Sequence, residues 1–509
     1  MTSALRRFRA PGKWVGAAAV AAALSTLAVS NNAHAHGGVV RAFEILNHPA
    51  KPETFVLRSD VWGFFHSNDG GKSWQWSCSE VYGTKSTDVN HTQMALTASG
   101  RLLVANAFKG MHYTDDFCSW SKSSGLDDLL VSDVRIHSTG VLALTSTGSE
   151  DGISNIIWLS KDQGKTFETF NADLPKDIVL SSIAVAPSDP ERVYAMGVVI
   201  GKSEGVILRS KDGGKTFERF TAPAVEASRL SVRIQAVHPT NPDVVFEWVD
   251  LPEDLNQDAH DQISVTTDGG EAWATVFAGK GDLPGFAISP DAATLVISGA
   301  VDGVHSGSLD AVLAQANGAL TQVNPRPVWG LLWNENGLYG GNNNFSPKDT
   351  PETYTLGLSS NQGETFDEIV NICEFQFSYC QEGQQGHDLC KYNWDDASEA
   401  GGFKKDFWLN SGRCDPDGGL AGSGGGSSSG GGGSSSGGAS GSGAVTSASG
   451  GSAPSNGGGP AGTGGKGGSN QGGVDGGCAM SAPGSATSSG GLLAFALGAI
   501  GLGFLRRRR

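Results

Sequence analysis

An eight-residue motif recurs along the chain, and it restricts the possible folds more than any other sequence feature. The clearest copy is Ser210-Lys-Asp-Gly-Gly-Lys-Thr-Phe217, with a central Asp and an aromatic residue five positions later. Glycine tolerates positive φ, and Asp and Ser side chains bond nearby backbone amides, so each copy predicts a tight hairpin turn. One copy, Tyr113-Thr-Asp-Asp-Phe-Cys-Ser-Trp120, lacks the glycine. The central residues are Asp69, Asp115, Asp162, Asp212, Asp268 and Asn361.

The spacing of the motif predicts a β-propeller. Successive central residues lie 46, 47, 50, 56 and 93 residues apart, so one copy near residue 314 has decayed. A period of about 40–50 residues with one turn motif per unit is typical of propeller blades. Two prolines three positions apart recur in phase, beginning at Pro49, Pro187 and Pro239. We therefore expect an all-β, single propeller over residues 36–372, with six or seven blades, of which the period favours seven.

At these motifs the chain resembles the Asp-box (BNR) repeat propellers, in particular the sortilin-like group, in which the two prolines, a strand and the box recur as one unit. The resemblance covers about residues 38–370. It implies the propeller fold. For function it implies little, because sialidases, xyloglucanase-like glycosidases and binding proteins are built on such repeats.

Residues 1–35 predict an export signal. Basic residues open it, an apolar run follows over 15–29, and Ala33-His-Ala35 offers a small-x-small cleavage site. The formal net charge is −16, and it becomes about −24 once the basic residues of the two chain ends are left out. An acidic surface repels phosphate backbones and anionic lipid, so we expect no nucleic-acid partner.

The C-terminal part predicts a tether. Residues 418–477 are rich in Gly and Ser and nearly uncharged, so we expect a disordered linker. Cys478, an apolar run over 491–505 and Arg506–Arg509 then resemble the MYXO-CTERM sorting signal of myxobacteria and relatives. That resemblance implies cleavage near Cys478 and attachment to the cell surface. The alternative is an uncut membrane anchor, and both place the propeller outside the cytoplasmic membrane.

Six further cysteines predict disulfides in an exported protein. Cys78 and Cys118 stand at equivalent ends of neighbouring blades, so we expect them to pair with each other. An even set follows the last box, in a segment over 373–417 that we interpret as a small cap with two disulfides and three possible pairings. The cysteines of this cap are Cys373, Cys380, Cys390 and Cys414.

Enzymatic motifs are weak. A sialidase-like site needs an arginine cluster for the substrate carboxylate, but the early Phe-Arg-Ile-Pro motif is missing, and Arg233 in Ser231-Val-Arg-Ile-Gln235 fits it poorly. Asp60 in Arg58-Ser-Asp-Val-Trp-Gly63 resembles an Asp of the xyloglucanase-like glycosidases, whose motif has glycine at the position of Trp62. Glycoside hydrolysis needs two carboxylates at a set separation, so Asp60 is at best half of a catalytic site.

Several aromatic residues occur in the first blade. They could form a platform that binds sugar or peptide, but packing within the blade is the simpler explanation. They are Trp62, Phe64, Phe65, Trp74 and Trp76. The histidines are scattered, and no metal-binding spacing or calcium-loop motif occurs, so we expect no metal and no cofactor. The sequence favours an exported, surface-tethered propeller that binds a protein or glycan without catalysis. The alternatives are an extracellular glycoside hydrolase acting on polysaccharide and an assembly factor.

Overall fold

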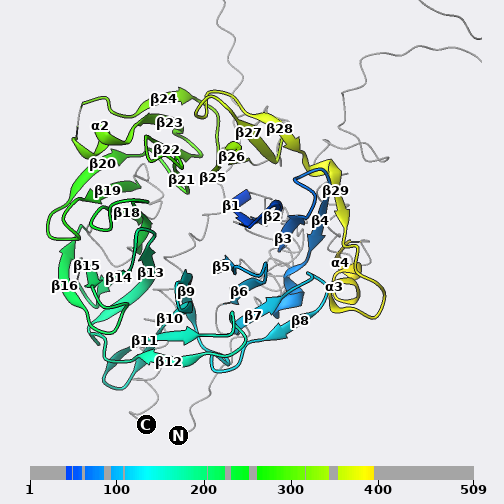
Figure 1. The fold of residues 1–509 in the computed structure, drawn as a ribbon, viewed down its shortest axis with the longest axis horizontal. Coiled ribbons are helices and arrows are strands. Elements are labelled where there is room, and N and C mark those ends of the chain that lie inside the picture. Colours follow the sequence, from blue (N-terminus) through cyan, green and yellow to red (C-terminus); the bar gives the residue numbers. More distant parts are fainter. Residues whose placement is uncertain are drawn as a thin grey trace, which may run out of the picture. The chain divides into compact units, whose positions relative to one another are not determined.

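The computed structural model describes residues 42–48, 50–59, 63–84, 93–106, 109–202, 204–223, 231–250, 261–315, 317–342 and 354–394. They form seven sheets arranged in a ring, which confirms an all-β propeller of seven blades (Figure 1). The predicted export signal, linker and sorting segment lie outside these residues. Among the helices that the structure describes, none is long and apolar enough to cross a membrane.

Each blade is an antiparallel sheet whose first strand lies nearest the centre of the ring and whose fourth strand lies outermost (Figure 1). The first blade contains β1 (Ala42–His48), β2 (Lys51–Ser59), β3 (Phe64–Ser67) and β4 (Trp74–Ser77). The second contains β5 (Gln93–Leu96), β6 (Leu102–Asn106), β7 (Gly110–Thr114) and β8 (Trp120–Lys122). The third contains β9 (Val131–His137), β10 (Gly140–Ser149), β11 (Gly152–Ser160) and β12 (Glu168–Asn171).

The remaining four blades repeat this order. The fourth contains β13 (Ile178–Ala186), β14 (Asp189–Val199), β15 (Gly205–Ser210) and β16 (Glu218–Ala222). The fifth contains β17 (Ser231–Val237), β18 (Val245–Asp250), β19 (Gln262–Thr266) and β20 (Ala274–Ala278). The sixth contains β21 (Gly285–Ile288), β22 (Thr294–Gly299), β23 (Gly303–Ser308) and β24 (Thr321–Asn324). The seventh contains β25 (Gly330–Asn334), β26 (Gly337–Gly341), β27 (Leu356–Ser359) and β28 (Asp367–Val370).

The recurring motif forms the turn between the third and fourth strands of six blades. In the fourth blade, Asp212 Oδ1 accepts hydrogen bonds from the amides of Lys215 at 3.1 Å and Thr216 at 2.9 Å. The Thr216 hydroxyl donates to Oδ2 at 2.6 Å, and the Ser210 hydroxyl donates to Oδ1 at 2.8 Å. These bonds, the one from the Thr216 hydroxyl foremost, lower the pKa of Asp212 to about 2. Equivalent turns form around Asp69, Asp162, Asp268 and Asn361.

The second of these turns departs from the sequence assignment by one residue. Asp116 accepts the amide bonds of the turn, from Cys118 at 2.9 Å and Ser119 at 2.7 Å. Phe117 directly after it has a φ of 60°, and the turn is one residue shorter than the others. The assignment of Asp115 was therefore wrong, because counting five residues back from the aromatic assumed a turn of full length.

The decayed copy lies in the sixth blade. The short helix α2 (Leu309–Leu313) occupies the connection between β23 and β24, where the other blades have the box. The Ser308 hydroxyl caps it by accepting a bond from the amide of Ala311. A capped helical turn thus replaces the hairpin turn that the motif forms elsewhere.

Arginines link each of two boxes to the preceding blade. Arg101 of the second blade pairs with Asp115, Nε to Oδ1 at 2.8 Å, and its Nη1 donates to the carbonyl of Asp162 in the third blade. Arg209 of the fourth blade donates in the same way to the carbonyl of Asp268 in the fifth, at 2.8 Å. The boxes therefore hold neighbouring blades together as well as their own hairpins.

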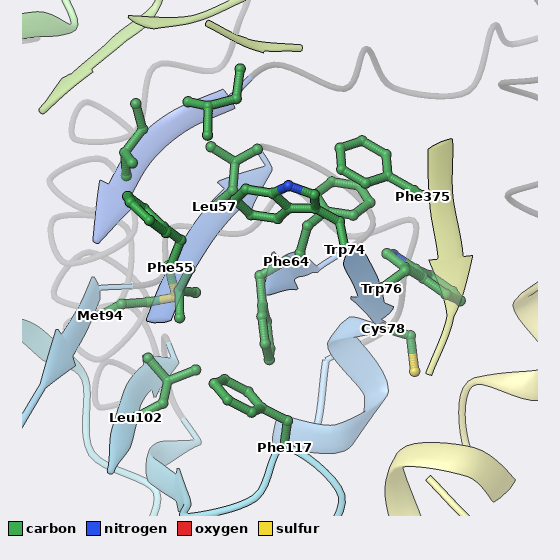
Figure 2. Packing of buried hydrophobic residues seen from close by; sticks show 14 of the residues in the cluster. Phe55, Leu57, Phe64, Trp74, Trp76, Cys78, Met94, Leu102, Phe117 and Phe375 are labelled. Carbon is green, nitrogen blue, oxygen red and sulfur yellow. The ribbon is translucent and has the colours of Figure 1, made fainter. Parts of the chain in front are cut away.

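An aromatic core fills the first blade (Figure 2). The side chains of Phe64, Phe65, Trp74 and Trp76 are almost completely buried, so they pack the blade and do not form an exposed platform. Trp62, the fifth aromatic residue of this group, lies outside the described residues. Phe65 stacks on a ring from the far end of the propeller sequence, with 3.9 Å between the two centroids.

That ring belongs to Phe375, in the segment that closes the propeller. After a turn of 3-10 helix, η2 (Ile372–Glu374), β29 (Phe375–Phe377) pairs in parallel with β4 at the outer edge of the first blade. The helices α3 (Gln385–Asp388) and α4 (Lys391–Trp394) follow at the outer side of the first two blades (Figure 1). Cys390, between them, is bonded to Cys78 directly before η1 (Ser79–Tyr82). The first and last strands of the described propeller therefore share one sheet.

Two disulfides fix this closure, and they correct the expected pairing. Cys78 bonds to Cys390, and Cys118 bonds to Cys380. The expected bond between Cys78 and Cys118 was wrong, and so was the expectation that the cap cysteines pair only among themselves. The reason is that β29 carries the cap along the outer edge of the first blade, which places a cap cysteine beside each blade cysteine. Cys373 is also disulfide-bonded, and Cys414 and Cys478 lie outside the described residues.

The bond between Cys78 and Cys390 spans 312 residues, so its loss returns much conformational freedom to the unfolded chain. We expect the double substitution Cys78→Ser, Cys390→Ser to lower the free energy of unfolding by about 2–5 kcal/mol. Denaturant unfolding measures the change. Tyr392→Ala is the matched control, because Tyr392 lies in α4, directly after Cys390 in the chain, and its side chain is exposed. Equal midpoints for the double variant and the wild type would contradict a closing role.

Asp212→Ala removes the acceptor that orders its turn, and we expect a loss of about 1–2 kcal/mol. Asp212→Asn keeps one acceptor oxygen, as Asn361 does in the seventh blade, and is expected to lose less. Because the pKa of Asp212 is lowered, its ionised form stabilises the fold fully above about pH 4 and loses this effect as the pH falls toward 2. Thermal unfolding at pH 7 and pH 2.5 tests this, and an undiminished gap between wild type and Asp212→Ala at the lower pH would contradict it.

Candidate functional site

Five charged side chains, here called the axial cluster, come from strands close to the centre of the ring. Three of them, Glu44, Asp133 and Arg233, are each the third residue of the first strand in the first, third and fifth blades. Arg58 on β2 and Arg135 on β9 complete the cluster. These blades are not neighbours, so their inner strands face one another only across the centre (Figure 1). Accordingly, all four other charges act electrostatically on Arg233.

Asp133 and Arg135 both form hydrogen bonds with the backbone of the inner strand of the next blade. Asp133 is fully buried, and its Oδ2 accepts a bond from the amide of Ile183 on β13 at 3.0 Å. Arg135 Nε donates to the carbonyl of the same Ile183 at 3.1 Å, and its Nη2 lies 3.2 Å from Asp133 Oδ2. This acidic and this basic side chain are therefore satisfied by each other and by one backbone unit, which makes them structural.

Glu44 and Arg58 form a second closed pair. They are direct partners in the register of β1 and β2, and Arg58 Nε lies 3.0 Å from Glu44 Oε2. Because they sit on adjacent strands of one sheet, the sheet itself sets their separation. Both carboxylates of the axial cluster thus already have an arginine partner.

Arg233 is the one arginine of the cluster that does not form an ion pair with Glu44 or Asp133. Arg233 is 8% exposed, and the described residues act on its guanidinium through their charges, without a hydrogen bond. Burial lowers its pKa; Asp133 and Glu44 oppose this shift, whereas the positive charges of Arg135 and Arg58 add to it. Among the described residues, the cluster holds three positive and two negative side chains, and a net positive charge suits an acidic group of a ligand.

One innermost strand of the ring is open to solvent near its end. Ile136, which follows Arg135 on β9, is 43% exposed although it lies on the innermost strand of its blade.

Of the two site candidates discussed from sequence, Asp60 and Arg233, the structure describes only Arg233. Asp60, the weak catalytic candidate, lies outside the described residues, so the structure leaves it a prediction. Arg233 was assigned a poor fit to a carboxylate clamp, and the structure brings it together with Arg58 and Arg135. Sequence reasoning missed that grouping because the three residues are far apart along the chain. The missed signal was the shared third position of the inner strands. No cluster of metal-binding side chains occurs in the part of the chain that the structure describes.

The fold and its turns define the class: a seven-bladed β-propeller with Asp-box turns. In agreement with this class, a family model described as sortilin, neurotensin receptor 3 (Sortilin-Vps10) matches residues 155–283, from β11 to just beyond β20. The match covers about a quarter of the chain. No curated protein matches the sequence.

Solved structures resemble the chain at the level of fold. Hydrazine synthase from Kuenenia stuttgartiensis is 15% identical with a TM-score of 0.40, covering 62% of this chain and 96% of that one. A GH74 xyloglucanase from Xanthomonas campestris is 15% identical with a TM-score of 0.32, covering 64% of this chain and 63% of that one. YCF48 bound to D1 peptide is 16% identical with a TM-score of 0.38, covering 59% and 90%. Function does not transfer at these values.

Two substitutions test which charged residues of the axial cluster stabilise the fold. Asp133→Leu leaves the Ile183 amide and the Arg135 guanidinium without their acceptor, and we expect a loss of about 3–5 kcal/mol. Arg233→Met removes a buried charge that has no described partner, so we expect an unchanged or higher free energy of unfolding. Urea unfolding at pH 7 compares them. A loss for Arg233→Met as large as that for Asp133→Leu would show that Arg233 holds the fold.

Proposed function

We propose that this chain is an exported, surface-attached propeller that binds a protein or glycan ligand without converting it, and that the ligand presents an acidic group to Arg233. The observation that carries the proposal is Arg233, a largely buried residue of an inner strand that adds the third positive charge of the axial cluster and has no hydrogen bond from its guanidinium to the described residues. A buried positive charge is unfavourable without a partner, so its presence at the point where blades converge is explained best by a ligand.

Binding without catalysis is supported by the state of the carboxylates. Glycoside hydrolysis requires two carboxyl groups, one acting as acid and one as base or nucleophile. Glu44 is paired with Arg58, and Asp133 is buried against Arg135 and a backbone amide, so neither is available for proton transfer. The glycoside-hydrolase alternative then depends on Asp60 and on a second acid outside the axial cluster.

Export and attachment are supported by the cysteines and by the sequence ends. Structural disulfides persist in oxidising compartments, and the bonds of Cys78 to Cys390 and of Cys118 to Cys380 lie buried at the closure of the ring, where Cys373 is also disulfide-bonded. The basic and apolar start of the sequence fits secretion, and the Cys478 segment with its terminal arginines fits attachment to the outer surface. The acidic net charge argues against a nucleic-acid partner.

The testing experiment is a glycan-array and protein-ligand binding screen on residues 36–416, together with a polysaccharide-hydrolysis assay. We expect binding of an acidic ligand that Arg233→Met weakens at least tenfold, and no release of sugar. Arg219→Met is the matched control, because Arg219 lies on the outer strand β16 and is more exposed. Release of sugar that disappears in Asp60→Asn would establish the glycosidase instead, and a ligand bound equally by Arg233→Met would remove Arg233 from the site.

A further inference from the structure

A second group without a described partner lies close to the binding site. Glu247 is in the middle of β18 in the fifth blade, fully buried, and neither of its carboxylate oxygens has a hydrogen-bond partner among the described residues. Val245 and Val249 share its face of the strand and belong to the apolar seam between the fourth and fifth blades. A carboxylate without partners in such a seam is stable only in its neutral form, and burial raises the pKa of Glu247 well above its ordinary value.

Titratable groups on the surrounding strands are engaged elsewhere. On β14, Tyr194 donates to the carbonyl of Pro242, and Arg192 donates to the Tyr194 hydroxyl. Asp189 and Glu191 stand at the solvent-accessible start of the same strand. On β15, Arg209 pairs with Glu218 and Glu271. Arg233 on β17 belongs to the axial cluster, and β13 and β19 carry no charged residues. None of these side chains bonds to Glu247.

The same seam holds the strand that carries Arg233. Ile234, the next residue on β17, lies directly opposite Glu247 in the register of β17 and β18. The amide of Ile234 donates to Ser182 Oγ of the fourth blade at 2.9 Å. On the other side of Arg233, the carbonyl of Val232 accepts a bond from the Ser181 hydroxyl. The position of Arg233 therefore depends on close contact between the fourth and fifth blades.

We propose that Glu247 makes this contact proton-dependent, so that the neutral side chain keeps the seam closed and Arg233 in place, and its ionisation loosens both. The proton is released to bulk water, and the resulting anion draws water into the seam or moves toward it. Since the native carboxyl holds its proton more tightly than the unfolded one, the seam is most stable at low pH and weakens as the pH rises. The effect on ligand binding rests on the function proposed above.

The experiment compares the full chain with Glu247→Gln and Glu247→Met, in which the group cannot ionise. Hydrogen exchange of the β17 and β18 amides is measured from pH 5.5 to 9 and corrected for the intrinsic rate. We expect protection in the wild type to fall at least tenfold relative to β26, which belongs to a distant blade, and to stay level in both variants. Two variants are used because the buried amide of Gln lowers stability by itself.

Binding of glucuronate, with glucose as the neutral match, is titrated in parallel. We expect the wild type to lose affinity with rising pH, in step with seam protection, and the Glu247 variants to lose none from this cause. Seam protection that is independent of pH in the wild type overturns the inference, whatever the binding result. Hydrogen-exchange protection of the seam that falls with rising pH in the wild type, but not in the Glu247 variants, supports the inference. If that result is found and glucuronate does not bind at pH 5.5, the proposed acidic ligand is contradicted and the inference about Glu247 stands.

Discussion

The structure depends on hydrogen bonds from the side chains of one blade to the backbone of the next. A single four-stranded sheet cannot bury both of its faces, so each blade is stable only between two neighbours. On the inner strands, Asp133 accepts a bond from the Ile183 amide and Arg135 donates to the Ile183 carbonyl. Ser182 Oγ likewise accepts a bond from the amide of Ile234. At the Asp-box turns, Arg101 and Arg209 connect neighbouring blades by donating to the carbonyls of Asp162 and Asp268 in the next blade. Because these partners are fixed in space, the blades are held in register as well as in contact.

A ring held together in this way has one point that local sequence cannot secure, where its two ends meet. There β29 extends the sheet of the first blade, Phe375 stacks on Phe65, and two disulfides tie the segment down. These crosslinks bridge residues more than 260 positions apart, so they act against the largest loops in the chain. Closure is thus achieved covalently at the one place where neighbouring blades are not consecutive in sequence.

Sequence reasoning succeeded where the determining physics is local. A box turn is built by side chains within six residues of one another, so its period predicted seven blades and located the decayed copy. It failed where the determinant is non-local. The partner of Cys78 is set by where β29 lies, and the role of Asp116 was hidden by a one-residue deletion. The convergence of Arg233 with Arg58 and Arg135 follows from the curvature of the ring, which no local pattern contains.

The distribution of buried charge supports a functional interpretation of the fifth blade. In the third blade, Asp133 and Arg135 show that this fold can satisfy buried charges completely. Arg233 and Glu247 lie on adjacent strands, and neither has a described partner. They lie on different sides of the sheet, the arginine toward the centre and the neutral carboxyl in the apolar seam, so they do not pair with each other. Buried polar groups without hydrogen-bond partners lower stability, and this is the pattern expected where selection acts on binding.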